Sequence, residues 1–307
     1  MTTVAAIDCG TNTIKLLIAQ YDGGQLVDIE REMRMVRLGQ DVDRTGVLAD
    51  EALARAFAAI DDYAALIRAH ECDHVRFVAT SASRDAKNAD VFVDGVRARL
   101  GIEPEVVPGT EEAALAFDGA VRGLRTPPAL PVLIVDIGGG STELIRGSSS
   151  AAGSRPDEAF SMDIGSVRLH ERHLRGDPPT RDEIAACRAD IEAALDACPV
   201  SPAQAGTVIG VAGTFTQLAA GVLGLDHYDR ALIDQARLRL DDLRVLVDRL
   251  LGMTVAERRH LPYMHPGRAD VIGSGGLIAV SVLARTGLAE FVVSESDILD
   301  GIAWSLV

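Results

Sequence analysis

Two stretches of the chain contain residue types that could bind phosphate groups. Residues 132–144 (VLIVDIGGGSTEL) place an aspartate, three glycines and two hydroxyl residues after an apolar run. Glycines let the backbone turn sharply, and the N–H groups of such a turn form a concave anion site. Residues 6–17 (AIDCGTNTIKLL) repeat the pattern at one constant offset, which favours two phosphate-binding hairpins over two unrelated glycine turns. The matched pairs are Asp8 and Asp136, Gly10 and Gly138, Thr13 and Ser141, and Leu16 and Leu144.

A third glycine turn, at Gly213 and Thr214, lies between a predicted strand and a predicted helix, and helix N-termini bind anions. Arg268 is expected to open a later helix and to contact a distal phosphate, although an ion pair with Asp270 is at least as good an interpretation. The predicted phosphate-binding residues are Gly10, Thr11, Asn12, Thr13, Gly138, Gly139, Gly140, Ser141, Gly213, Thr214 and Arg268.

Three acids lie next to the predicted phosphate turns and are candidate metal ligands: Asp8, Asp136 and Glu143. Mg²⁺ usually keeps several waters and is held by one or two carboxylates together with substrate phosphates. The sequence therefore predicts a Mg²⁺ site here. The alternatives are that the aspartates bond to their own turns and that Glu143 points to solvent from its strand.

Cleavage of a terminal phosphoanhydride needs an oriented water, a base and charge stabilisation on the transferred group. Arg84, after a predicted strand, could bind non-bridging oxygens through its planar guanidinium, or could pair with Asp85. Glu111 and Glu112 are the candidate bases. Two acids in a first helical turn also stabilise the helix by ~0.3–1 kcal/mol each, so the residues alone leave that interpretation open.

The predicted elements follow a similar order in the two halves of the chain. The first half is expected to form a hairpin at 3–21, strands at 25–35, 74–80 and 103–107, helices at 50–70 and 85–100, and a helix with Thr110 as its N-cap. The second half is expected to form strands at 159–163, 207–211 and 290–293, a helix ending at His173, a helix at 240–251, capping boxes at Thr180/Glu183 and Thr254/Glu257, and a glycine-rich helix from Arg268.

Residues 124–131 (LRTPPALP) are rich in proline and mark the predicted domain boundary. We therefore expect an N-terminal domain of residues 1–125, with the first hairpin and the candidate bases, and a C-terminal domain of residues 126–307, with the second hairpin. The last helix is expected to pack back on the first domain.

Composition restricts the class of protein. The formal net charge of −15 argues against nucleic acid as a partner, because nonspecific affinity for it depends on clustered basic residues. The four cysteines lie far apart without metal-ligand spacing, which fits a reducing compartment. Residues 197–225 are uncharged but contain prolines and glycines, and the N-terminus lacks a basic segment. We expect a cytoplasmic protein with neither a membrane span nor a signal peptide.

The motifs and their order resemble those of the exopolyphosphatase / guanosine pentaphosphate phosphohydrolase (Ppx/GppA) family, within the actin/hexokinase/heat-shock ATPase superfamily. The matching segments, in chain order, are DCGTNT, ATSASRDA, PGTEEA, DIGGGSTEL, GSVRLHE and VAGTFTQLA. Thr11 and Thr13 stand where the first family motif usually has serines, and they keep the hydroxyl groups. The match extends from Val4 to Leu299.

The resemblance implies an α/β fold of duplicated ribonuclease H-like (actin-like ATPase) domains with a central cleft. It also implies a homodimer, and a short form without the C-terminal helical domain of longer members. The implied reaction is Mg²⁺-dependent hydrolysis of inorganic polyphosphate, with the water activated by a glutamate of the E-E-A segment, for which we favour Glu112. The alternatives are a guanosine pentaphosphate 5′-phosphohydrolase, linked to the stringent response, and a polyphosphate- or nucleotide-binding sensor without turnover.

Overall fold

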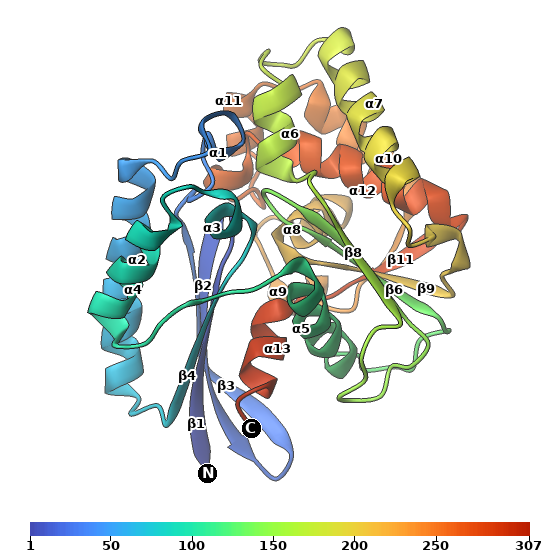
Figure 1. The fold of residues 1–307 in the computed structure, drawn as a ribbon. Helices are drawn as coiled ribbons and strands as arrows, with labels where there is room; N and C mark the ends of the chain where they lie inside the picture. Colours follow the sequence, from blue (N-terminus) through green and yellow to red (C-terminus); the bar gives the residue numbers. More distant parts are fainter. The chain divides into compact units, whose positions relative to one another are not determined.

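The computed structural model describes residues 1–307, which form two compact units (Figure 1). Unit 1 contains Met1–Gly119 and Ile298–Val307, and unit 2 contains Ala120–Asp297. The chain therefore passes from unit 1 into unit 2 and ends in unit 1. The sequence places the boundary at 125/126, in the proline-rich segment, whereas the contacts divide the chain within a helix, between Gly119 and Ala120.

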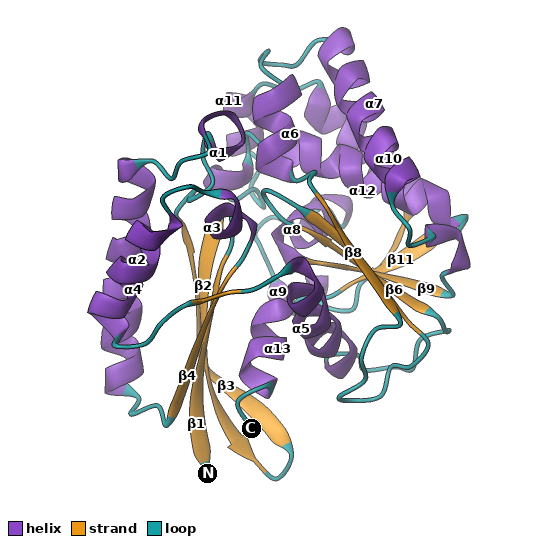
Figure 2. Ribbon diagram, in the orientation of Figure 1, coloured by secondary structure: helices purple, strands orange, loops and turns teal.

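Unit 1 is built on a five-stranded sheet with the strand order β3-β2-β1-β4-β5 (Figure 2). Strands β1 (Thr2–Cys9), β2 (Thr13–Asp22) and β3 (Gln25–Met35) are antiparallel. Strands β4 (His74–Ala79) and β5 (Glu105–Val106) continue the sheet parallel to β1. Most of β1 is buried, which explains its nearly continuous apolar sequence.

Part of the core that packs on this sheet is aromatic. Tyr63, Phe77 and Phe92 are among its largest fully buried side chains, and the Tyr63 hydroxyl donates to the Ile14 carbonyl at 3.0 Å. The helices are α1 (Val42–Thr45), α2 (Asp50–Ala69), α3 (Ser81–Asp85), α4 (Ala89–Leu100), α5 (Gly109–Arg122, whose last turn enters unit 2) and α13 (Ile298–Trp304).

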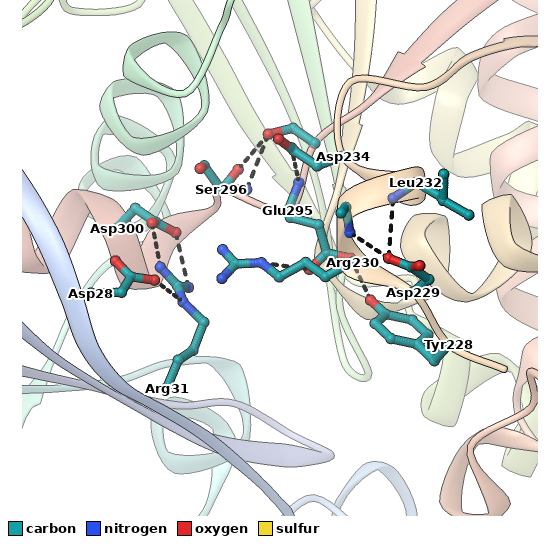
Figure 3. Close-up of polar contacts among 12 residues, drawn as sticks. Asp28, Arg31, Tyr228, Asp229, Arg230, Leu232, Asp234, Glu295, Ser296 and Asp300 are labelled. Atoms are coloured by element: carbon teal, nitrogen blue, oxygen red, sulfur yellow. Dashed lines mark hydrogen bonds and ion pairs between the residues drawn. The ribbon is translucent and has the colours of Figure 1, made fainter.

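The C-terminal helix α13 packs on β1 and β2 of unit 1. Arg31 of β3 donates two hydrogen bonds to the Asp300 carboxylate of α13, at 2.6 and 3.3 Å (Figure 3). A Cβ atom on Gly301 would lie 1.9 Å from the Leu115 carbonyl oxygen of α5, so this helix crossing requires glycine. These contacts fix the end of the chain to its beginning.

Unit 2 is built on a six-stranded sheet with the order β10-β11-β9-β6-β7-β8. Strands β6, β7 and β8 are antiparallel, β9 and β11 run parallel to β6, and β10 is an antiparallel edge strand. Their bounds are β6 (Val132–Ile137), β7 (Thr142–Gly147), β8 (Glu158–Met162), β9 (Thr207–Val211), β10 (Arg237–Arg239) and β11 (Glu290–Val293).

The helices of unit 2 surround α12, which is almost completely buried. Both predicted capping boxes are confirmed, at Thr180/Glu183 and Thr254/Glu257. The helices are α6 (Ser166–His173), α7 (Arg181–Ala197), α8 (Ala212–Val222), α9 (Arg230–Ile233), α10 (Leu240–Leu251), α11 (Val255–Arg259) and α12 (Ile272–Thr286), with 3₁₀ turns η1 (Pro202–Gln204) and η2 (Pro266–Arg268). None of the helices combines the length and the apolar composition that a membrane span requires.

The two sheets share one plan, as the repeat in the sequence predicts. The order β3-β2-β1-β4-β5 in unit 1 corresponds to β8-β7-β6-β9-β11 in unit 2, with three antiparallel strands followed by two parallel ones. In each unit a glycine turn joins the first two strands. The phosphate hairpins therefore occupy equivalent positions in two related structures.

The predicted helix at 85–100 is wrong in its first part. The structure has two helices, α3 and α4, separated near Lys87. The Lys87 N–H donates to the Gly46 carbonyl at 2.9 Å, and the Asn88 amide bonds both backbone groups of Leu48. Because these groups bond to a distant loop, they do not form the hydrogen bonds of a continuous helix.

Two predicted helix starts are also wrong. Helix α5 begins at Gly109 rather than after Thr110, because the Pro108 carbonyl accepts from the N–H groups of Glu111 and Glu112. Arg268 does not open the glycine-rich helix. It ends the 3₁₀ turn η2, and α12 begins at Ile272.

Candidate active site

Hydrogen bonds within the turn and to neighbouring segments fix the first hairpin of unit 1. The Gly10 N–H donates to the Thr13 carbonyl at 2.9 Å and closes the turn. The Asn12 carbonyl accepts from the N–H groups of Val36 and Arg37, just after β3, and the Thr11 hydroxyl bonds the Ser81 hydroxyl at 2.9 Å. The Asn12 side chain is buried, and its Nδ2 has no hydrogen-bond partner. The turn is thus fixed with a buried amide donor unused, which suits an anion ligand.

Asp8 precedes this turn and lies opposite Lys15 in the strand register. The Lys15 ammonium is 3.3 Å from Asp8 Oδ2, and both side chains are largely buried. The carboxylate predicted as a metal ligand in this hairpin therefore already has a cation beside it. Lys15 is not among the residues predicted from the sequence, although antiparallel pairing across the hairpin places it on the same face as Asp8.

The second hairpin, in unit 2, is supported by the N-terminus of α6. The Gly138 N–H donates to the Ser141 carbonyl at 3.0 Å, as in the first hairpin. Ser166 N–H donates to the Gly138 carbonyl and Val167 N–H to that of Gly139, both at 2.9 Å. Because the carbonyls of these glycines are bound by α6, the turn is rigid and its peptide planes are fixed.

Asp136 and Glu143 lie opposite each other across this hairpin, one at the end of β6 and one in β7. Both are buried, and the Ser161 hydroxyl donates to Glu143 Oε1 at 2.6 Å. Glu143 therefore does not point to solvent. No group of three or more His, Cys, Asp and Glu side chains could hold a metal ion, but a facing carboxylate pair fits Mg²⁺ that also binds water and phosphate.

The two candidate bases have different surroundings in unit 1. Glu112 is 8% exposed, and its Oε2 is 3.2 Å from Arg84 Nη1, which also donates to the Val107 carbonyl. Glu111 is half-exposed and is bound by Arg76 Nη2 at 2.7 Å. Arg76 also binds Glu105, so Glu111 belongs to a surface ion-pair network. The structure brings together Arg84 and Glu112, two of the predicted catalytic residues, and separates Glu111 from them.

The third glycine turn joins β9 to α8 in unit 2. Ala212 has φ +63°, a left-handed conformation that is strained for a residue with a side chain. The Thr214 hydroxyl donates to the Ile137 carbonyl at 3.0 Å and ties this turn to the second hairpin. A Cβ atom on Gly213 would lie 1.9 Å from Arg268 Nη2, so the Arg268 guanidinium lies directly on this turn. The predicted residues Gly213, Thr214 and Arg268 are thus neighbours.

Ionisable groups that the sequence did not indicate lie near Arg268. Burial lowers the pKa of Arg268, whereas Tyr228, Asp297 and Glu295 act to raise it. Burial raises the pKa of Glu295, which Tyr228 and Arg230 oppose. Figure 3 shows both partners: the Tyr228 hydroxyl donates to Glu295 Oε1, and Arg230 Nε is 3.5 Å from Oε2. Glu295 follows the parallel strand β11, and polar residues at the carboxyl ends of parallel strands are the signal that could have found it.

Comparison with known proteins places these features in one family. Residues 17–306 match the model of the Ppx/GppA phosphatase family. The chain is 48% identical over 324 residues to Exopolyphosphatase 2 of Mycobacterium tuberculosis, covering 100% of this chain and 99% of that protein.

Solved structures give the same result. A crystal structure of an exopolyphosphatase-like protein has a TM-score of 0.95 at 45% identity, covering 99% of this chain and 97% of that chain. A crystal structure of an exopolyphosphatase from Cytophaga hutchinsonii has a TM-score of 0.90 at 27% identity, with the same coverage. The predicted fold class, duplicated actin-like α/β domains, is therefore confirmed.

Proposed function

Because the chain belongs to the Ppx/GppA phosphatase family, we propose that it is an exopolyphosphatase that hydrolyses terminal phosphate from inorganic polyphosphate. In this reaction a water oxygen bonds to the terminal phosphorus, and the bridging P–O bond breaks. The shortened chain keeps the bridging oxygen, and a carboxylate accepts the proton of the water. The products are orthophosphate and a polyphosphate one unit shorter.

We assign the base role to Glu112, and its contact with Arg84 is the observation that carries the proposal. A base for this reaction must face the site, and its carboxylate must not be engaged in surface ion pairs. Glu112 is buried with a guanidinium beside it, whereas Glu111 is held by Arg76. Arg84 would orient the Glu112 carboxylate and bind the phosphoryl oxygens that approach it. Each of the two residues therefore has a separate role.

The glycine turns would hold the polyphosphate chain. In unit 1 the buried Asn12 amide offers an unused donor next to the Thr11 and Thr13 hydroxyls. In unit 2 the rigid turn at Gly138–Gly140, with Ser141, offers backbone and hydroxyl donors. Such preformed donors bind anions with little reorganisation, which also offsets the repulsion expected from a net charge of −15.

We propose Asp136 and Glu143 as the residues that would hold Mg²⁺. Bound there, the ion would neutralise charge on the substrate phosphates. The sequence also predicts Asp8 as a ligand, but Lys15 already balances its charge, so we assign Asp8 a weaker contribution.

A cytoplasmic location, a homodimeric assembly and a link to the stringent response also belong to the proposal, and they follow from the family resemblance alone.

The first test is phosphate release by the purified protein with Mg²⁺ from long polyphosphate, tripolyphosphate, guanosine pentaphosphate and ATP. The proposal predicts that, of these four substrates, long polyphosphate is hydrolysed with the highest kcat/KM. If guanosine pentaphosphate is cleaved in preference to polyphosphate, the protein is a guanosine pentaphosphate phosphohydrolase instead. Binding of these ligands without any phosphate release would replace it with the sensor.

A further inference from the structure

Arg268 ends a short segment that lies outside the α-helices of unit 2. The segment is residues 263–268, which lie within the connection between α11 and α12 and include the 3₁₀ turn η2. The Arg268 guanidinium at the end of this segment lies on Gly213, although nearby Glu295 could attract it elsewhere. Both carboxylate oxygens of Glu295 are instead engaged by Tyr228 and Arg230. Glu295 is therefore not free to draw Arg268 away from the glycine turn.

The segment of residues 263–268 packs on one face of α8. Gly213, Gln217 and Gly221 are spaced four residues apart, so they line one side of the helix. A Cβ atom on Gly221 would lie 2.9 Å from the Tyr263 hydroxyl oxygen, and one on Gly213 would overlap the Arg268 guanidinium. The two glycines thus leave room for the two ends of the segment.

Gln217, between the glycines, binds the backbone of the segment with both halves of its amide. Its Nε2 donates to the Tyr263 carbonyl at 2.5 Å, and its Oε1 accepts from the His265 N–H at 2.9 Å. The side chain is 2% exposed, so these bonds are made away from water. A carboxylate of the same length lacks the donor and an apolar side chain lacks both groups, so neither could make this pair of bonds.

We propose that Gln217 is a positioning residue for polyphosphate binding: it holds residues 263–268 on the Gly213/Gln217/Gly221 face of α8, so that Arg268 lies at the third glycine turn. The inference rests on the proposed function and on the prediction from the sequence that Arg268 contacts a distal phosphate, and it names how Arg268 is set in place. Gln217 touches no phosphate itself. Its effect on polyphosphate binding depends on Arg268. A double mutant can therefore distinguish Gln217 from a residue that only stabilises the fold.

A double-mutant cycle in the full-length protein tests this, with KM for polyphosphate as the readout and urea unfolding of each variant alongside. Arg268→Ala should raise KM about 10–100-fold, as loss of a charge-assisted contact to phosphate does. Gln217→Ala should raise KM about tenfold with little change in kcat. In the Arg268→Ala background, Gln217→Ala should change KM by less than about twofold. The exposed Gln204→Ala in η1 serves as the matched control and should leave KM unchanged.

Gly213→Ala provides a second variant whose folding is less at risk, because the three atoms nearest to the new methyl group all belong to the flexible end of the Arg268 side chain. It should reproduce the KM of Arg268→Ala with an unchanged unfolding midpoint. Additive KM effects of Gln217→Ala and Arg268→Ala, or a normal KM for Gly213→Ala, would overturn the proposal. If the wild type releases no phosphate from polyphosphate, the proposed function itself fails, and the two failures are therefore distinguishable.

Discussion

Lys15 and Glu143 occupy equivalent positions in the two hairpins. Lys15 lies opposite Asp8 in unit 1, and Glu143 lies opposite Asp136 in unit 2. The duplicated plan therefore carries opposite charges at the same place: an ammonium neutralises the aspartate in one hairpin, and a second carboxylate joins it in the other. The two hairpins are related in backbone and different in electrostatics.

This difference predicts where the divalent metal binds. Glu143→Gln should raise the Mg²⁺ concentration for half-maximal activity by about tenfold or more, because a coordinating carboxylate is lost. Asp8→Asn should change that concentration much less, because the carboxylate it removes is already paired with Lys15. Phosphate release measured against Mg²⁺ concentration checks both variants. Equal shifts for the two would contradict the assignment of the metal to the second hairpin.

A pH effect on stability is expected from His265. Its pKa is lowered from 6.5 by burial and by Arg268, and its Nδ1 must be unprotonated to accept from the Gly267 N–H. Well above pH 6.5 the histidine is neutral in both states and adds no pH dependence. As the pH falls below that value, the unfolded state binds the proton first, so the free energy of unfolding decreases.

His265→Asn keeps an acceptor for the Gly267 N–H but removes the titration. Urea unfolding at a series of pH values from neutral to mildly acidic should show a smaller loss of stability in the variant than in the wild type. Glu295 has a raised pKa and works in the opposite direction, but it is common to both proteins and cancels in the comparison. A loss of equal size in both proteins would contradict the role of His265. The exposed His227→Asn is the matched control and should follow the wild type.

Stability of unit 1 should depend on the glycine at the crossing of α13 and α5. Gly301→Ala puts a methyl group 1.9 Å from the Leu115 carbonyl oxygen, and relieving this overlap should cost about 1–3 kcal/mol of unfolding free energy or more. The same change at Gly252, where the nearest atoms are at 3.5 Å or beyond, should be neutral or slightly stabilising. Thermal unfolding of the two variants compares them directly. A Gly301→Ala protein as stable as Gly252→Ala would show that the helices can separate without loss.

The hairpins and most strands could be predicted because their signals are local. A glycine turn after an apolar run, or a threonine three residues before a glutamate, acts through neighbouring backbone groups, as in the Thr180/Glu183 capping box. The break between α3 and α4 could not be predicted in this way, because the bonds that cause it come from Gly46 and Leu48 in a distant loop. Local propensity favours helix there, and tertiary hydrogen bonds override it.

The candidate site shows the same limit. A buried glutamine such as Gln217 cannot be told from a surface glutamine by residue type, and only the fold brings it to the Tyr263 carbonyl. The choice between Glu111 and Glu112 likewise depends on Arg76 and Arg84, which come from other elements of unit 1. Family resemblance identified the pair, and the structure distinguishes its members by burial and partner.

The most direct test of the account is the kcat of Glu112→Gln beside that of Glu111→Gln, measured as phosphate release from polyphosphate. The amide keeps the size of the side chain and removes the basic oxygen. We predict that Glu112→Gln lowers kcat by about 10²–10⁴-fold, as loss of a general base does. Glu111→Gln should stay within about a few-fold of wild type, because it loses only a partly exposed ion pair with Arg76. A normal kcat for Glu112→Gln, or a larger loss for Glu111→Gln, would contradict the assignment of Glu112 as the base.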